Sequence, residues 1–152
     1  MKVFRFLVLF FVSLTFLFSM SAISNVEAGI WPTSAATLCW KGTGDVPPGT
    51  VIMKLRSFPI GGSNYLLSGK ITVDNKTHNI VNGNAVVGTN VLMTINAAGK
   101  DAEAMWRSTC YIVLSGTTLN GKVECIGHDY NRADLSIDTE FSTGSITKIT
   151  CP

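Results

Sequence analysis

Two cysteines, Cys110 and Cys125, restrict the fold of this chain more than any other feature of its sequence. They lie equally far from a midpoint between Thr117 and Thr118, within the stretch WRSTCYIVLSGTTLNGKVECIG. A turn at that midpoint predicts a β-hairpin in which the two cysteines face each other, within reach of a disulfide. Because threonine is a poor residue for a two-residue turn, which needs positive φ, we expect a four-residue loop over 116–119. Such a loop makes the cysteines a non-hydrogen-bonded pair, the closer cross-strand geometry.

In this register the side chains of the hairpin separate into an apolar and a polar face, because side chains alternate along a strand. The face expected in the core holds Trp106, Cys110, Ile112, Leu114, Leu119, Val123 and Cys125. The face expected in solvent holds Arg107, Tyr111, Lys122, Glu124 and His128. A rival register, centred on the type I′ turn signal of Asn120 and Gly121, moves the cysteines out of alignment.

The first 28 residues have the layout of a secretory signal peptide. Lys2 and Arg5 precede the apolar run FLVLFFVSLTFLFSM, and small residues flank Glu27 before a cleavage point after Ala28. An uncleaved membrane anchor is the alternative, since the apolar run is just long enough to span a bilayer. We expect a signal peptide over 1–28, a tail over 29–37 and one domain over 38–152.

Export agrees with the cysteine content of the chain. Without Lys2, Arg5 and Glu27 of the leader, 10 Lys+Arg and 9 Asp+Glu remain, and all four cysteines lie after the leader. Four cysteines in an exported chain predict two disulfides, and the hairpin leaves Cys39 to pair with Cys151. The near-neutral charge argues against nucleic acid or an anionic membrane surface as a partner.

Alternating apolar and polar residues predict β-strands along the rest of the chain. Short segments of this type recur at spacings of about 10 residues, and no window supports a helix of more than a turn or two. One alternation runs from Asp134 to Phe141, and it predicts Leu135, Ile137, Thr139 and Phe141 inward and Asp134, Asp138 and Glu140 in solvent. A final strand is expected over 145–151. These segments predict eight or nine strands, and without a predicted helix the chain is expected to be all-β.

Glycine recurs inside three of these strands. LSGKITV, VNGNAVV and LNGKVEC form a weak repeat that contains Gly69, Gly83 and Gly121. Glycine within a strand is typical of the bends of small coiled barrels. Short sequential connections predict a meander, and closing it into a barrel removes its two open edges. We therefore expect one up-and-down barrel of about eight strands, which also brings Cys39 and Cys151 together; a two-sheet sandwich is the alternative.

This architecture resembles that of lipocalins, avidins and certain bacterial inhibitor barrels in strand count and export alone. The lipocalin first-strand G-x-W is absent, because Leu38 and Cys39 precede Trp40. The polar inward side chains on which avidins rely are absent from the expected inward face, which is almost wholly apolar. The resemblance therefore assigns the chain to no family.

The chain offers little for catalysis. No nucleophile elbow, phosphate loop or metal-spaced histidine pair is present, and the only histidines are His78 and His128. We expect no enzyme, no cofactor and no metal. The polar segment that includes His128 and Tyr130 is either a recognition loop or an ordinary turn.

Binding is the better-supported class of function. The expected interior, with Tyr65, Met93, Trp106 and Phe141 as the candidate ligand contacts, either encloses a small apolar molecule or packs as a solid core. If the interior is solid, function moves to a protein partner, with Trp31, His128 and Tyr130 as candidate contacts, as in a secreted inhibitor-type protein. Trp31 otherwise folds back and covers one end of the domain.

Overall fold

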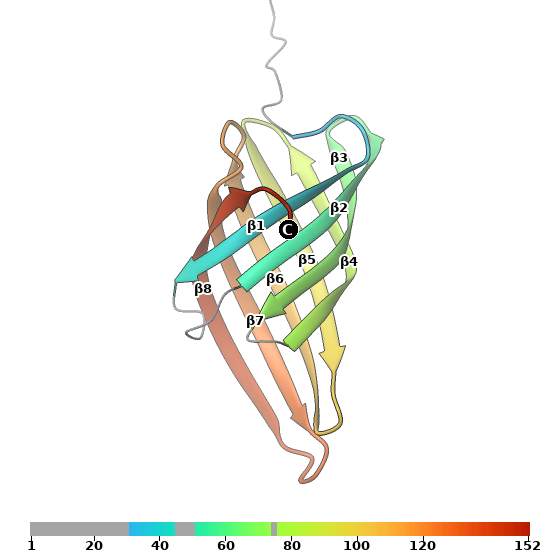
Figure 1. Cartoon of the computed structure of the whole chain (residues 1–152), viewed down its shortest axis with the longest axis vertical. Coiled ribbons are helices and arrows are strands. Elements are labelled where there is room, and N and C mark those ends of the chain that lie inside the picture. Colours follow the sequence, from blue (N-terminus) through green and yellow to red (C-terminus); the bar gives the residue numbers. More distant parts are fainter. Residues whose placement is uncertain (1–30, 45–50, 74–75) are drawn as a thin grey trace, which may run out of the picture.

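The computed structural model describes residues 31–44, 51–73 and 76–152, which form a closed eight-stranded β-barrel (Figure 1). The strands are β1 (Ala36–Gly44), β2 (Val51–Gly61), β3 (Asn64–Val73), β4 (Lys76–Val87), β5 (Asn90–Lys100), β6 (Ala104–Ser115), β7 (Gly121–Asn131) and β8 (Ile137–Ile149). Each strand is antiparallel to the next, and β8 pairs with β1. The all-β barrel is therefore confirmed, and the sandwich alternative is wrong. The described part of the chain holds no helix able to cross a membrane.

The alternation of apolar residues explains most of the strands. Met53 and Leu55 on β2, Tyr65 and Leu67 on β3, and Val91, Met93 and Ile95 on β5 are buried, while most of the residues between them are exposed or half-buried. Because the side-chain period of a strand is two, this alternation turns one face of each of these strands toward a common interior.

The central hairpin has the predicted register. Cys110 lies opposite Cys125 and Arg107 opposite His128. The amide of Ser115 donates to the carbonyl of Asn120 at 2.8 Å, which leaves the predicted four-residue loop over 116–119. The Cα atoms of the disulfide-bonded cysteines are 4.1 Å apart, as expected for a non-hydrogen-bonded pair. The rival register at Asn120 and Gly121 is wrong.

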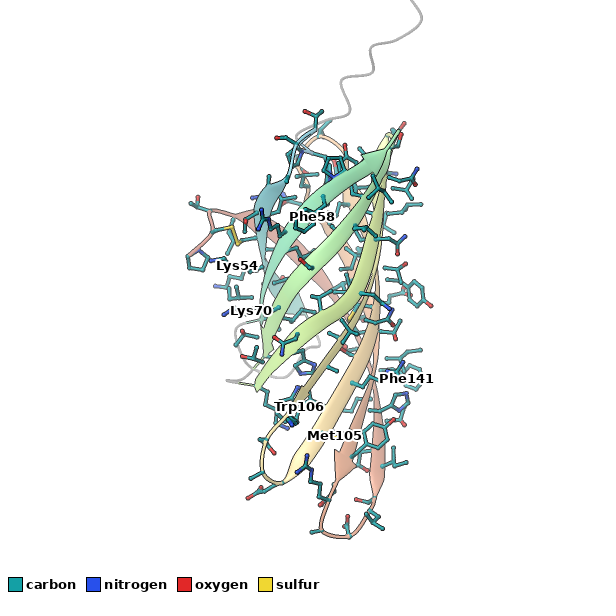
Figure 2. The ribbon with its side chains drawn as sticks, turned by 90° about the vertical axis from the view of Figure 1, so that its right-hand side faces the viewer. Lys54, Phe58, Lys70, Met105, Trp106 and Phe141 are labelled. Carbon is teal, nitrogen blue, oxygen red and sulfur yellow. A yellow bond between two sulfur atoms is a disulfide. The ribbon has the colours of Figure 1, made fainter. Side chains whose placement is uncertain are left out.

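Strand β8 differs from the prediction in length and in the face that points inward. The two segments expected over 134–141 and 145–151 are largely one strand, and Ser142 of β8 lies opposite Cys125 of β7. Because Cys125 points inward, Ser142 and Glu140 face the interior as well. The inward placement of Leu135, Ile137, Thr139 and Phe141 is therefore wrong; the side chain of Phe141 is 77% exposed on the outer face (Figure 2).

Two of the three repeated glycines lie where the backbones of neighbouring strands come too close for any side chain. A Cβ atom at Gly69 would lie 2.0 Å from the carbonyl oxygen of Lys54, and one at Gly121 would lie 1.9 Å from that of Val113. Gly69 also has a φ of 154° and lies at a register shift between β3 and β4. The register shift at Gly69 agrees with the expectation that glycines mark the bends of a small barrel, whereas Gly121, the first residue of β7, marks a close approach of two strands.

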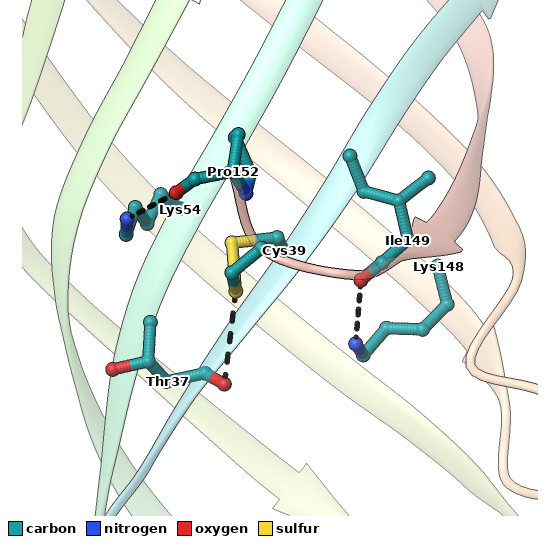
Figure 3. The surroundings of a disulfide bond; sticks show 7 residues. Thr37, Cys39, Lys54, Lys148, Ile149 and Pro152 are labelled. Carbon is teal, nitrogen blue, oxygen red and sulfur yellow. Dashed lines mark hydrogen bonds between the residues drawn. A yellow bond between two sulfur atoms is a disulfide. The ribbon is translucent and has the colours of Figure 1, made fainter.

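A disulfide closes the seam between the first and last strands. Cys39 of β1 is bonded to Cys151, which follows β8, as predicted (Figure 3). The segment after β8 crosses the outer side of β1, and the Lys54 ammonium of β2 donates to the carbonyl of Pro152 at 2.9 Å. The segment after β8 is thereby attached to β1 and to β2 at the place where the barrel closes.

One end of the barrel is filled with aromatic side chains. Trp31 is buried, and its ring centroid lies 6.3 Å from that of Trp40 and 5.7 Å from that of Tyr65. The Trp40 indole donates to the carbonyl of Leu119 at 2.7 Å. Trp31 therefore folds back to cover this end of the domain, which was one of its two predicted roles.

The opposite end of the barrel is uneven. The β5–β6 and β7–β8 hairpins extend well beyond the ends of β1 to β4 (Figure 1). The two hairpin tips are joined, because the amide of Arg132 donates to the carbonyl of Glu103 at 3.0 Å. The inner face of these hairpins forms a wall beside the open end.

Candidate functional site

The open half of the barrel contains a cavity of about 310 Å³. The filled end of the barrel closes the cavity at its bottom, and the pair of protruding hairpins forms one wall beside its mouth. The apolar residues that line it come from strands all round the barrel: Val51, Met53, Ile71, Val73, Ile95, Ile112, Val123 and Ile146. The interior is therefore neither wholly solid nor wholly hollow: one half of the barrel is packed, and the other half contains the cavity.

A polar wall accompanies these apolar side chains. It includes Lys76, His78, Ser108, Asp129, Glu140 and Ser142. Asp129 and Glu140 come from the inward face of the β7–β8 hairpin, near its tip. The expectation of an almost wholly apolar interior is wrong at this end. Glu140 is exposed to solvent, as expected, but it lies on the inward face of β8 and lines the cavity.

Lys76 crosses the mouth of the cavity. Its ammonium nitrogen lies 5.0 Å from the ring centroid of Trp106 on β6 and 3.7 Å from Asp129 Oδ2 on β7. β4, which carries Lys76, pairs with neither of these strands. Both members of the Lys76–Asp129 ion pair are 49% exposed, so the pair is solvated and contributes little to stability.

His78 lies beside this ion pair and is half-buried. Its ring centroid is 5.5 Å from that of Trp106. Burial lowers the pKa of His78 below its usual value; the Asp129 carboxylate raises the pKa and the Lys76 ammonium lowers it, both by less than burial does. At neutral pH the imidazole is therefore uncharged, and it offers the cavity a hydrogen-bonding group without a positive charge.

The Cys110–Cys125 disulfide is part of the cavity wall. Both cysteines line the cavity, and Ile112 continues the same face toward the filled end. The disulfide therefore holds together two of the strands that form the cavity.

The four predicted ligand contacts do not form this site. Tyr65 packs against Trp31 at the filled end, and Met93 is buried in the core. Trp106 is buried next to the mouth, against Gly99 and Lys76, but it is not one of the lining residues (Figure 2). Phe141 lies on the outer face.

The predicted partner contacts are also separated. Trp31 is buried at the filled end, whereas His128 and Tyr130 lie together on β7 with ring centroids 6.4 Å apart. His128 Nδ1 is 3.0 Å from Thr139 Oγ1. Around them the outer face of β6 to β8 exposes Met105, Ile126, Ile137 and Phe141.

The missed residues of the polar wall could be found from strand register. Once Cys125 points inward, alternation places Gly127 and Asp129 inward too. A four-residue loop over 132–135, like the one over 116–119, then brings Ser142 opposite Cys125 and Glu140 opposite Gly127. Register would thus have identified the acidic wall, whereas the hydrophobic alternation of β8 indicated the wrong face.

Comparison with known proteins places this barrel in no family. No protein-family model matches the chain, and no curated protein is significantly similar to it in sequence. Fold and site define it as a small disulfide-closed β-barrel with a half-hollow interior. Among the described residues, no three His, Cys, Asp or Glu side chains are grouped so that they could hold a metal ion.

Proposed function

We propose that this chain is an exported binding protein that holds one small, mainly apolar molecule in the open half of its barrel. The observation that carries this proposal is the cavity of about 310 Å³ above a tightly packed floor. Ligand pockets typically begin at about 300 Å³ and are lined by apolar side chains with a few convergent polar groups. The cavity fits that description at its lower limit, so the ligand is small.

The chemistry of the wall supports an elongated ligand with two different ends. Met53, Ile71, Ile95 and Ile112 surround the inner part of the cavity with hydrocarbon. The charged and polar side chains gather at the mouth, where a polar group of the ligand can stay close to water. Burial of the apolar part supplies the affinity, at roughly 25 cal/mol per Å² of surface removed from water.

Export is part of the proposal. Two disulfides within the described barrel suggest an oxidising compartment. The predicted signal peptide over 1–28 lies outside the described residues. Together these features favour a protein that works in the periplasm or outside the cell.

Blocking the cavity tests this function. Ile112→Trp adds bulk on the inner wall, whereas Val113→Trp adds the same group at the next residue, whose side chain is 48% exposed. We expect the wild-type protein and Val113→Trp to bind a hydrophobic fluorescent dye saturably with one-to-one stoichiometry. Ile112→Trp should lose that binding at least tenfold. Absence of saturable binding to the wild-type protein, or equal binding by both variants, would contradict the proposal.

The alternative of a secreted inhibitor-type protein has one feature in its favour, the exposed apolar outer face of β6 to β8. Phe141 and Ile137 are 77% and 59% exposed there, and exposed apolar patches often mark protein interfaces. The cavity is the more specific of the two features, because it sets both a size and a chemistry for its occupant.

A further inference from the structure

We propose that the ligand of the cavity carries a cationic amine at its polar end, held at the mouth by the carboxylates of Asp129 and Glu140. This inference rests on the proposed function, because it names the chemical class of the molecule bound in the same cavity. Three independent observations support it: an ammonium already held at the mouth, an unneutralised carboxylate beside it, and the distribution of charge over the barrel.

The first observation is that the mouth already binds an ammonium group of the chain itself. Lys76 Nζ lies over the ring of Trp106, 5.0 Å from its centroid, and 3.7 Å from Asp129 Oδ2. An aromatic face attracts an ammonium ion through its ring quadrupole, and the carboxylate adds the attraction of an opposite charge. Because Lys76 and Asp129 are both 49% exposed, the lysine can swing into solvent and leave its place to a ligand.

The second observation is the balance of charge around the cavity. Lys76 neutralises one of the two carboxylates, and Glu140 has no ion pair among the described residues. His78 adds no positive charge, since burial keeps its pKa low. Arg107 contributes to the wall from an outward position, between the inward residues Trp106 and Ser108, and it is exposed. Of the two carboxylates in the wall, that of Glu140 is therefore the one without an ion pair, and an ammonium group of a ligand can pair with it.

The third observation is the separation of charge over the described barrel. Six of its seven side-chain carboxylates lie toward the open end, on the two protruding hairpins, where they outnumber the cations Lys100, Arg107 and Arg132: Asp101, Glu103, Asp129, Asp134, Asp138 and Glu140. The described parts of β1 to β3 hold no carboxylate, and they carry Lys41, Lys54, Arg56 and Lys70. In Figure 2, Lys54 and Lys70 lie far from the protruding hairpins. Such a field draws cations to the mouth and repels anions from it.

Three probes with the same eight-carbon chain test the inference on the full folded protein. Octylamine is cationic at pH 7, octanol is neutral and octanoate is anionic. Their affinities can be measured by displacement of the hydrophobic dye at low ionic strength. We expect octylamine to bind about tenfold more tightly than octanoate, with octanol between them, and the difference to shrink as salt is added.

Two substitutions should shift this preference in opposite directions. Glu140→Gln removes the free carboxylate, and it should lower the affinity ratio of octylamine to octanol about three- to fivefold. Lys76→Gln removes the competing ammonium, and it should raise the same ratio by a similar factor. Using the ratio cancels any change in the apolar part of the cavity. Both residues are exposed, so both variants should fold.

The outcomes separate this inference from the proposed function. If neither the dye nor any of the three probes binds, the cavity is not a ligand site and both proposals fail. If the dye binds and no probe displaces it, the cationic assignment is wrong. If all three bind with equal affinity, or octanoate binds best, the cavity binds ligands but the cationic assignment is wrong. The assignment also fails if Glu140→Gln and Lys76→Gln leave the ratio unchanged.

Discussion

Two leucines, one at each end of the barrel, have a left-handed backbone conformation, and only one of them is compensated for its cost. Leu119 and Leu135 each occupy the last position of a four-residue hairpin loop, with φ of 55° and 60°. This conformation costs a non-glycine residue about 1–2 kcal/mol. Leu119 is fully buried and its carbonyl accepts the Trp40 hydrogen bond, so packing offsets the cost. Leu135 is 83% exposed and has no such compensation.

His78 makes the stability of the protein depend on pH. Burial lowers the pKa of its imidazole below the usual value, so the unfolded chain takes up a proton at a higher pH than the folded protein does. The stability associated with neutral His78 is complete above the unfolded pKa of about 6.5 and is lost as the pH falls toward the folded pKa. Urea unfolding between pH 7.5 and pH 5 should show this loss, and His78→Gln should reduce it. Equal pH dependence in both proteins would contradict this assignment.

Single residues were predictable where a covalent or packing constraint acted on them. Cys110 opposite Cys125 and Cys39 paired with Cys151 are both correct. The polar wall was not predicted, because charged residues such as Asp129 and Glu140 are typical of the solvent-facing side of a strand. A carboxylate near the mouth of an open cavity remains partly hydrated, so composition alone does not distinguish the two positions.

At the scale of strands, the β7–β8 hairpin explains the largest error. Where strands enclose a core, burial favours one face strongly, and the alternation of apolar residues is reliable. The tip of this hairpin extends beyond β1 to β4, so both of its faces meet water (Figure 1). Apolar Ile137 and Phe141 consequently lie on the outer face. The inner face of β8 can be identified only from its pairing with β7, in which Cys125 points inward.

Replacing Gly69 or Gly121 should destabilise the barrel, because neighbouring strands come very close at these two positions. Gly69→Ala and Gly121→Ala place a Cβ atom within about 2 Å of a backbone oxygen, so the strands must move apart. We expect each variant to lose about 2–4 kcal/mol of unfolding free energy, measured by urea denaturation.

Gly127→Ala provides the matched control for this prediction. Its nearest contacts to an added Cβ are carbonyl oxygens at 3.9 Å, so the expected change is within about 0.5 kcal/mol. Similar losses in all three variants would show that close strand approach is not the cause.

At the scale of the whole molecule, the two disulfides should contribute unequally. The chain-entropy relation assigns about 3 kcal/mol to a loop of about 15 residues and nearly 5 kcal/mol to one of about 100. The sequence separations are 15 for Cys110–Cys125 and 112 for Cys39–Cys151. We therefore expect the double variant Cys39→Ala/Cys151→Ala to be destabilised more than Cys110→Ala/Cys125→Ala in urea unfolding. The reverse order would mean that local geometry outweighs loop length.

The architecture was predictable from the sequence, and its division into two halves was not. Alternating strands, short connections and a leftover cysteine pair are enough to indicate a closed barrel. The hollow half depends on how far each hairpin extends and on where Trp31 packs, and neither is encoded in a local pattern. An apolar residue such as Ile112 has the same sequence signature whether it touches a neighbour or a cavity.

The Cys39–Cys151 disulfide also affects what a single proteolytic cut does to the protein. It joins the start of β1 to the segment after β8, so the strands and loops between them form one covalent ring. A single cut in any loop of that ring opens it without releasing a fragment, and the two pieces stay joined and paired through the sheet. A nicked molecule can therefore remain a barrel with its cavity intact.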